Sequence, residues 1–281
     1  MDLGLKDKVV LVTGGAGGIG SALVYAFSRE GAKLAIHYGK NQKRADELLF
    51  DVGGSKSNLI VQAELKEPAS IADMFTTVVR RFGRIDVLVN NAGMSLREDV
   101  DIDERPPEEW DAMFQVNLRA AGLACGHFLH QLETHHNAGS VVFIGSTAGE
   151  YGEIHNDLYS TMKAGLHGLM ISQASKLGKL SPPGRANMVA PGWTLTPMPS
   201  VKEFLGNKAA VIRALQSRMI PDLCRPADIV GQVLMLSSDT MARAITGQTI
   251  VVDMGMNPRT QWSHDNPRLD EAYQRIVESM K

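Results

Sequence analysis

The feature that most constrains the fold of this chain is a glycine-rich turn close to its N-terminus. The apolar run at residues 9–12 leads into residues 13–20, in which five of the eight residues are glycine, and a helical pattern follows. Glycine permits a tight turn and a close approach of the backbone to a ligand, while free N–H groups at the start of the helix favour an anion. A glycine-rich run also fits a flexible loop, but its position between a first strand and a first helix predicts a site for the pyrophosphate of a dinucleotide.

Short apolar runs alternate with longer helical patterns along the rest of the 281 residues. Strands are expected at residues 9–12, 33–37, 59–63, 86–89, 140–144, 186–189 and 249–252, and helices at residues 21–30, 43–50, 70–82, 107–132, 159–180 and 227–236. Strands this apolar are covered on both faces, and strand–helix alternation produces a parallel sheet with right-handed crossovers. The sequence therefore predicts a single α/β domain over residues 1–258, a doubly wound Rossmann fold with a parallel sheet and helices on both faces.

Two regions fall outside this alternation. Residues 195–221 form a long insert with three prolines. The insert is either an ordinary surface connection or a mobile lid, because long insertions in compact domains often act as lids. Residues 259–281 form a polar tail with a short amphipathic helix at its end. We expect this tail to be disordered or to dock on a partner subunit.

Composition argues against several classes of function. The chain carries 29 basic and 31 acidic residues, a net charge of −2, so no electrostatic argument supports binding to nucleic acid or to an anionic membrane surface. No segment approaches the roughly 20 apolar residues of a membrane span, and the N-terminus lacks the pattern of a secretory signal. The two cysteines, Cys125 and Cys224, have neither metal-ligand nor redox-pair spacing. We therefore expect a cytoplasmic protein without a metal.

A tyrosine and a lysine four residues apart open the helical pattern at residues 159–180. Residues i and i+4 share a helix face, so the Tyr159 hydroxyl and the Lys163 ammonium point the same way. An isolated tyrosine has a pKa near ~10 and is a poor base, but a nearby cation stabilises the phenolate and lowers that pKa. The same spacing is common in structural helices, so it needs support from a third group. Ser146 supplies it, because it ends a strand at the edge where ligands bind, and its hydroxyl is able to hold a substrate oxygen.

Several motifs occur in a characteristic order: glycines at positions 14, 18 and 20, Asn-Asn-Ala-Gly at 90–93, the Ser146, Tyr159 and Lys163 set, and a Pro-Gly turn at 191–192. Over residues 8–255 the chain resembles the compact branch of the short-chain dehydrogenase/reductase family, and is similar to 3-oxoacyl-ACP reductase-like members. The resemblance implies an NAD(P)(H)-dependent oxidoreductase that interconverts a ketone or aldehyde and a secondary alcohol by hydride transfer. It makes Tyr159 the general acid/base and Ser146 the group that orients the substrate oxygen. It gives Asn117 a water that links Lys163 to solvent.

The same resemblance indicates which residues contact the cofactor. They come from the glycine turn, the ends of the next three strands, the helix that carries Tyr159 and the Pro-Gly turn: Gly14, Ala16, Gly17, Gly18, Ile19, Gly20, Tyr38, Lys40, Asn41, Glu64, Leu65, Asn91, Ala92, Gly93, Tyr159, Lys163, Pro191, Gly192, Thr194 and Thr196. Glu64 stands where relatives usually carry the aspartate that bonds the adenine amine. The Thr194 backbone and the Thr196 hydroxyl are expected to bind the nicotinamide carboxamide.

The end of the second expected strand favours NADP(H) over NAD(H). An acid at that point bonds the ribose 2′-hydroxyl and repels a 2′-phosphate. By resemblance Tyr38 occupies the place of this acid, and Lys40, Lys43 and Arg44 follow closely. Ala16 argues the other way, because many NADP-dependent relatives carry a basic residue at its place in the glycine turn.

The substrate is less well defined than the cofactor. Residues 150–156 form one wall of its site, where Glu153 and His155 either meet the hydroxyls of a polyol or sugar or face solvent. Trp193 and Met198 on the other side suit an apolar portion of the substrate. With Ser146 these are the candidate substrate residues. A 3-oxoacyl thioester, a secondary alcohol and a sugar all remain open.

The expected helices at residues 107–132 and 159–180 carry many small residues. The family uses these helices in dimer contacts, so we expect a homo-oligomer, a dimer or a tetramer, that acts on a small-molecule carbonyl or alcohol. The alternative function is a catalytically silent NAD(P)-binding regulator or scaffold, although all four residues of the catalytic set are present. An epimerase or dehydratase would need a different glycine spacing and a larger C-terminal region.

Overall fold

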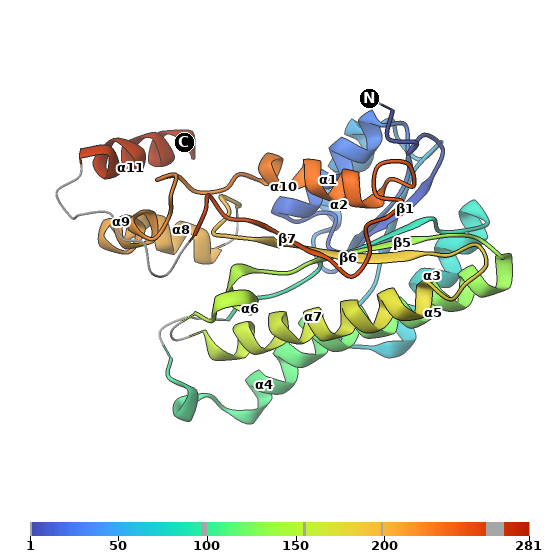
Figure 1. Cartoon of the computed structure of the whole chain (residues 1–281), viewed down its shortest axis with the longest axis horizontal. Helices are drawn as coiled ribbons and strands as arrows, with labels where there is room; N and C mark the ends of the chain where they lie inside the picture. Colours follow the sequence, from blue (N-terminus) through green and yellow to red (C-terminus); the bar gives the residue numbers. More distant parts are fainter. Residues whose placement is uncertain (1, 97–99, 154–155, 198, 257–266, 281) are drawn as a thin grey trace.

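The chain folds around a parallel sheet whose two faces are both covered by helices (Figure 1). The computed structural model describes residues 2–96, 100–153, 156–197, 199–256 and 267–280. Within these residues the sheet has seven strands in the order β3-β2-β1-β4-β5-β6-β7, and every neighbouring pair is parallel. The strands are β1 (Val9–Val12), β2 (Lys33–Tyr38), β3 (Leu59–Gln62), β4 (Val87–Asn90), β5 (Ser140–Ile144), β6 (Arg185–Pro191) and β7 (Thr249–Val252). This confirms the predicted doubly wound fold.

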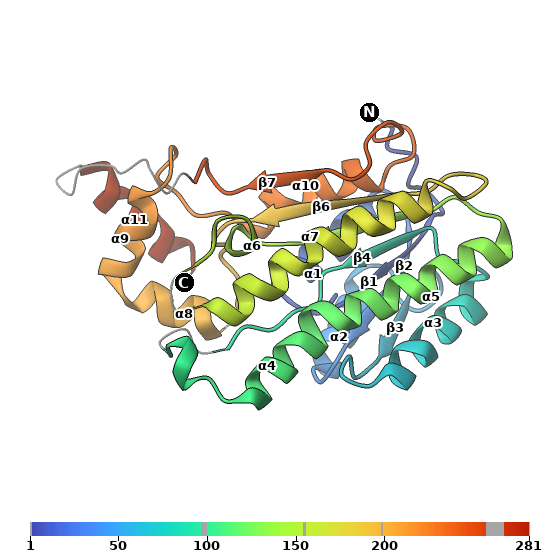
Figure 2. The same ribbon diagram turned by 60° about the horizontal axis from the view of Figure 1, so that its bottom comes forward.

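Two separate apolar cores hold the helices on the sheet. Figure 2 shows α5 and α7 lying side by side along one face, with α3 beside α5. Successive side chains of a strand point to opposite faces, so Leu11 enters the core of this face while Val10 and Val12 enter the other. One face carries α3 (Pro68–Phe82), α4 (Pro107–Phe114), α5 (Ala120–His135) and α7 (Asp157–Leu177), and the other carries α1 (Gly18–Arg29), α2 (Gln42–Asp51) and α10 (Pro226–Ser237). Because both faces are buried, the strands are nearly continuous apolar runs.

The helix predicted at residues 107–132 differs from the observed one in its middle. It consists of α4, a π-helical segment η2 (Gln115–Arg119) and α5, and it continues to His135. A π-helical turn accommodates an extra residue and often lies at a functional site. Here the buried Asn117 lies at its centre. Hydrophobic periodicity does not reveal such a turn, because the flanking helices keep the same direction.

The insert and the C-terminal tail pack together at one end of the molecule (Figure 1). The insert contains α8 (Pro199–Gly206) and α9 (Lys208–Gln216), and the tail ends in α11 (Pro267–Ser279). Leu269, Ala272 and Ile276 of α11 are fully buried in a third apolar cluster that also contains Val211 and Leu215 of α9. The tail was predicted to be disordered or to dock on a partner subunit. The helix α11 is not disordered but packs on its own chain, and docking on a partner subunit stays a prediction. Its spacing of apolar residues already defined the buried face but not what would cover it.

None of the helices in the described ranges has both the length and the apolar character that crossing a membrane requires.

Candidate active site

A cavity of about 700 Å³ opens at the carboxyl ends of the strands. Ligands of doubly wound sheets bind at this edge. All twenty residues predicted to contact the cofactor line this one cavity, and so do the candidate substrate residues Ser146, Glu153 and Trp193. The other two candidates, His155 and Met198, lie outside the described residues. The fold therefore brings together residues that the sequence spreads from position 14 to position 196.

The glycine turn forms the floor of the cavity where β1 meets α1. Gly14 has a φ of +63°, which favours glycine. A Cβ atom at Gly20 would lie 2.2 Å from the Gly14 carbonyl oxygen, so no side chain fits there. Gly17 precedes α1 and offers no side-chain cap to its N-terminus. The first N–H groups of the helix thus receive no side-chain cap, which fits the anionic ligand that the sequence predicts for this turn.

His37, which the sequence interpretation overlooked, holds the glycine turn in place. The backbone N–H of Gly14 donates to His37 Nδ1 at 2.9 Å, and His37 Nε2 donates to the Ala63 carbonyl oxygen at 3.1 Å. These two bonds require the neutral ring with its proton on Nε2. Burial lowers the pKa of His37, and this favours the same neutral form. A histidine inside an otherwise apolar strand was the only sequence signal for this role.

The Asn-Asn-Ala-Gly motif after β4 fastens the same turn from the other side. Asn91 Nδ2 donates to the Thr13 carbonyl oxygen at 2.8 Å and to the Gly14 carbonyl oxygen at 3.1 Å. In return, Thr13 Oγ1 accepts from the backbone N–H groups of Asn91 and Ala92. The motif thereby fixes the turn between β1 and β4.

The predicted catalytic side chains meet at the end of β5. Ser146 caps α6 (Thr147–Tyr151), and its Oγ accepts from the backbone N–H of Ala148 at 3.1 Å. Tyr159 lies in the first turn of α7, with Lys163 Nζ 5.5 Å from the centre of its ring. Lys163 Nζ donates to the Ile144 carbonyl oxygen at 2.8 Å. Burial lowers the pKa of Lys163 to about 8.

Asn117 lies behind the cavity wall and bonds to backbone groups. Its Oδ1 accepts from the Met94 N–H at 3.0 Å, and its Nδ2 donates to the Met94 carbonyl oxygen at 3.0 Å and to that of Met113 at 3.2 Å. The side-chain amide thus holds the loop after β4 against the π-helical segment. The water that the resemblance assigns to Asn117 stays a prediction.

The turn after β6 provides the wall expected for the nicotinamide. Thr194 Oγ1 donates to the Gly192 carbonyl oxygen at 2.8 Å, and the Thr194 backbone pairs with Cys224. Thr196 is buried, and its Oγ1 has no hydrogen-bond partner among the described residues. A buried hydroxyl without a partner is costly in an empty cavity and suits a polar ligand group such as a carboxamide. The residues present therefore fit a bound nicotinamide nucleotide.

The end of the cavity that is expected to hold the adenosine is bounded by the ends of β2 and β3. Tyr38 is buried, Lys40 is exposed at the rim, and Asn41 caps α2 by accepting from the Arg44 N–H at 3.1 Å. Arg44 forms an ion pair with Glu47 at 3.2 Å and does not line the cavity. The Glu64 carboxylate accepts from the backbone N–H of Lys66 at 3.1 Å. Of the three basic residues after β2, only Lys40 thus lines the cavity.

Across the described ranges, no group of three or more His, Cys, Asp or Glu side chains is arranged to hold a metal ion.

A doubly wound sheet, a glycine turn at one end of the cavity and a Ser/Tyr/Lys set at the other define a nucleotide-dependent oxidoreductase. Comparison with known proteins agrees. A family model described as enoyl-(acyl carrier protein) reductase matches residues 14–257. A 7alpha-hydroxysteroid dehydrogenase of Bacteroides fragilis is 32% identical over 259 residues, covering 89% of this chain and 95% of the relative.

Two further relatives are equally similar. A 3-oxoacyl-[acyl-carrier-protein] reductase of Synechocystis is 32% identical over 253 residues, 90% of this chain and 98% of the relative. An L-rhamnose 1-dehydrogenase (NAD(P)(+)) of Sphingomonas is 32% identical over 258 residues, 90% of this chain and 97% of the relative. The chain belongs to the short-chain dehydrogenase/reductase family. It is an NAD(P)-dependent oxidoreductase of CH–OH and carbonyl groups, and nothing favours the silent regulator left open by the sequence.

Proposed function

We propose that this oxidoreductase works through Tyr159 as general acid/base, with Ser146 and Lys163 as its partners. The observation that carries the proposal is the convergence of the three side chains on one cavity, with Lys163 Nζ 5.5 Å from the Tyr159 ring. Bound nicotinamide supplies the hydride in the reducing direction and accepts it in the oxidising direction. The three side chains handle the substrate oxygen and its proton.

In the reducing direction Ser146 Oγ donates a hydrogen bond to the carbonyl oxygen and orients it. The Tyr159 hydroxyl then gives its proton to that oxygen, which leaves a phenolate. The Lys163 ammonium stabilises this phenolate, because an opposite charge nearby favours the ionised form. Oxidation of the alcohol runs through the same groups in reverse, with the proton passing from the alcohol to Tyr159.

Replacing Tyr159 by Phe tests this assignment. The variant keeps the ring but loses the proton donor, so kcat falls by roughly 10²- to 10⁴-fold while cofactor affinity is retained. Steady-state kinetics and cofactor fluorescence titration measure the two quantities separately. Tyr151→Phe is the matched control, because Tyr151 is 46% exposed on α6 and does not line the cavity. Near-normal turnover of Tyr159→Phe contradicts the proposal.

We further propose that the chain prefers NADP(H). Support comes from Lys40 at the rim of the cavity, from the nearby N-terminus of α2 and from the absence of an acid at Tyr38, all at the end of β2. A 2′-phosphate gains from both a cation and a helix N-terminus. Lys40→Ala is expected to weaken NADPH binding roughly tenfold and to leave NADH binding unchanged. Lys43→Ala is the control, since Lys43 does not line the cavity; tighter binding of NADH by the unmodified chain overturns the preference.

We also propose a homo-oligomer, a dimer or a tetramer, in the cytoplasm. The small residues Gly126 of α5 and Gly168 of α7 both face open space, which leaves room for the helices of a second subunit. Both cysteines are free and buried, in keeping with a reducing compartment. Light scattering of the purified chain measures the assembly, and a monomer contradicts it.

The relatives do not identify the substrate of this chain, so the residues of its own cavity must indicate it. The named substrates of the relatives differ, since they include a hydroxysteroid, an oxoacyl carrier protein and a sugar. The names of these relatives, each 32% identical to this chain, thus share a reaction at a hydroxyl or carbonyl carbon but differ in the rest of the substrate molecule.

A further inference from the structure

The substrate end of the cavity contains an acidic side chain that the proposed chemistry does not use. Two of the described residues lining the cavity are acidic: Glu64 at the adenosine end and Glu153 between α6 and α7. Glu153 shares its stretch of wall with Ser146, Asn156 and Tyr159. A half-buried carboxylate here faces whatever the enzyme holds next to the reacting carbon.

The Glu153 carboxylate is held in one orientation. Trp193 Nε1 donates to its Oε1 at 3.1 Å, and Asn156 Nδ2 donates to its Oε2 at 3.1 Å. Each carboxylate oxygen can accept more than one hydrogen bond, so both keep acceptor capacity. Burial raises the pKa of Glu153, while Asn156, Trp193 and the charge of Arg218 oppose that rise. The carboxyl group is therefore preorganised but incompletely solvated.

Trp193 in turn is fixed by the insert. Its ring stacks on Phe204 of α8, with ring centres 4.1 Å apart and planes 18° from parallel. It also packs against the apolar cluster formed by α9 and α11. The insert and the C-terminal helix thus fix the position of the indole. The indole N–H in turn fixes the orientation of the Glu153 carboxylate. An apolar ring beside a fixed acceptor complements a molecule with C–H surface and hydroxyl groups.

We propose that Glu153, oriented by Trp193 and Asn156, is a specificity-determining residue that accepts a hydrogen bond from a substrate hydroxyl and selects an uncharged polyhydroxy compound, a sugar or polyol. This inference rests on the proposed oxidoreductase function. A substrate without the hydroxyl displaces water from the half-buried carboxylate and leaves its remaining acceptor capacity unfilled, and sites of this kind discriminate strongly against such analogues. An anionic substrate is repelled by the like charge.

The test compares three kinds of probe with the whole chain and NADP+. D-Galactose and sorbitol are polyhydroxy probes, cyclohexanol lacks the additional hydroxyls, and 3-hydroxybutyrate carries a negative charge. We expect the better polyhydroxy probe to exceed the other two in kcat/KM by roughly a hundredfold or more. Quenching of Trp fluorescence in the Tyr159→Phe background measures probe binding without turnover.

Three variants connect that preference to Glu153. Glu153→Gln keeps the shape but loses the charge, and it lowers kcat/KM for the polyhydroxy probe roughly 10- to 100-fold, mainly through KM. Trp193→Phe keeps the stacked ring but loses the N–H donor, and it changes the same quantity by a smaller factor. Glu150→Gln is the matched control, because Glu150 is an exposed acid of α6 outside the cavity. Glu150→Gln retains NADPH affinity and the turnover of every probe, whereas in Glu153→Gln the loss for cyclohexanol is much smaller than the loss for the polyhydroxy probe.

The outcomes separate this inference from the proposed function. Equal or better turnover of cyclohexanol or 3-hydroxybutyrate overturns the role of Glu153 and leaves the oxidoreductase assignment standing. Equal losses for all probes in Glu153→Gln also overturn it. A third outcome is that no probe is turned over, but the polyhydroxy probe binds and Glu153→Gln weakens this binding. It supports the recognition role of Glu153 and contradicts the proposed chemistry. If the polyhydroxy probes are not turned over and do not quench the Trp fluorescence, the inference is overturned.

Discussion

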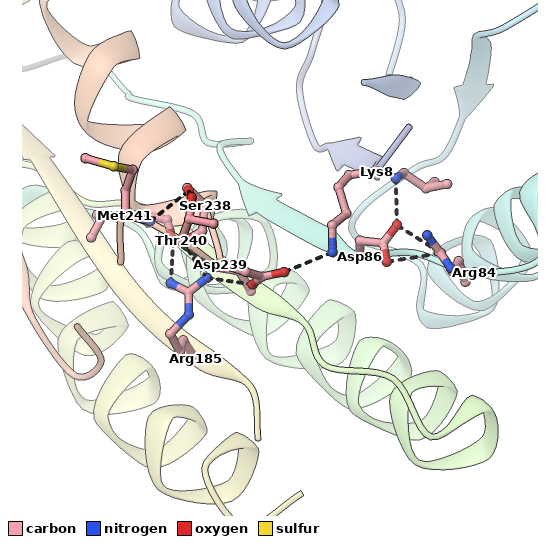
Figure 3. Close-up of polar contacts among 11 residues, drawn as sticks. Lys8, Arg84, Asp86, Arg185, Ser238, Asp239, Thr240 and Met241 are labelled. Carbon is pink, nitrogen blue, oxygen red and sulfur yellow. Dashed lines mark hydrogen bonds and ion pairs between the residues drawn. The ribbon is translucent and has the colours of Figure 1, made fainter. Parts of the chain in front are cut away.

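A cationic side chain is buried at each of the two edges of the sheet, but the two side chains differ in their hydrogen-bond and ion-pair partners. At the carboxyl edge Lys163 is 4% exposed and donates to one backbone carbonyl, and no described residue forms an ion pair with it. At the amino edge Arg185 is 8% exposed and donates to the carbonyl oxygens of Leu236 and Ser238 and to Asp239. Figure 3 shows the Asp239 carboxylate between Arg185 and Lys8.

The difference separates a cation with a proposed role in chemistry from one that stabilises the fold. Burial alone would raise the pKa of Asp239, but the hydrogen bonds and charges of Lys8 and Arg185 hold it below its ordinary value. The same edge also ties β1 to the residue before β4, because Asp86 accepts from the Val9 N–H at 2.8 Å and from Arg84. Charges at this edge are compensated, whereas burial at the carboxyl edge leaves Lys163 with a pKa of about 8.

The largest expected effect is the loss of turnover in Lys163→Met. Without the cation the Tyr159 phenolate is no longer stabilised, so kcat falls by roughly a thousandfold. The folded chain should nevertheless gain stability, because the charged form of a buried lysine costs on the order of 3 kcal/mol at neutral pH. Denaturant unfolding at pH 7 measures the gain. If Lys163→Met is less stable than the parent chain, Lys163 is not a destabilising cation and does not differ from Arg185 in this way.

The pH dependence of stability gives the same prediction a second readout. The folded pKa of Lys163, about 8, lies below its unfolded value, so the unfolded chain binds more protons between the two. The contribution of Lys163 to stability therefore rises as the pH increases from about 8 toward the unfolded value. Lys163→Met should lack this rise.

Arg185→Met is expected to have the opposite effect at the other edge. It removes the guanidinium donor from the carbonyl oxygens of Leu236 and Ser238, which keep the Ser140 hydroxyl and the Ala242 N–H as donors, and it removes one partner of Asp239. The loss of these charge-assisted hydrogen bonds costs about 2 kcal/mol of unfolding free energy. Turnover per folded molecule stays unchanged, because the residue lies at the edge away from the cavity. Lys8→Met is the control, since its more exposed pair with Asp239 contributes less than about 1 kcal/mol. Equal losses of unfolding free energy in Arg185→Met and Lys8→Met would show that the buried Arg185 contributes no more than the exposed Lys8.

The smallest effect concerns His37 beneath the glycine turn. Its folded pKa is lowered, so the stability tied to its neutral form is complete above the unfolded value and is lost as the pH falls through the folded pKa. A protonated ring cannot accept from the Gly14 N–H, so NADPH affinity should drop roughly tenfold on acidification. NADPH titrations across this pH range measure the drop. His37→Asn retains an acceptor that does not titrate, and an unchanged pH slope in it would contradict the role of His37.

Local patterns were enough to determine the fold class and most of the cavity. Hydrophobic periodicity located the seven strands within one or two residues at their ends. The glycine turn and the Tyr159 and Lys163 pair were recognisable because their members are sequence neighbours on one element. Parallel strands then bring their carboxyl ends to one edge, so placing each motif at a strand end also placed it in the cavity.

Contacts between distant segments were decided by tertiary structure alone. Gly14 meets His37 across 23 residues, Glu153 meets Trp193 across 40, and Arg185 meets Asp239 across 54. The energies of these bonds depend on burial and on partners that no local window contains. For the same reason, the apolar stripe of α11 predicted a buried face, while only packing decided that the chain's own insert covers it. The sequence determined the class of reaction, and the tertiary structure determined which groups hold and tune the residues proposed to catalyse it.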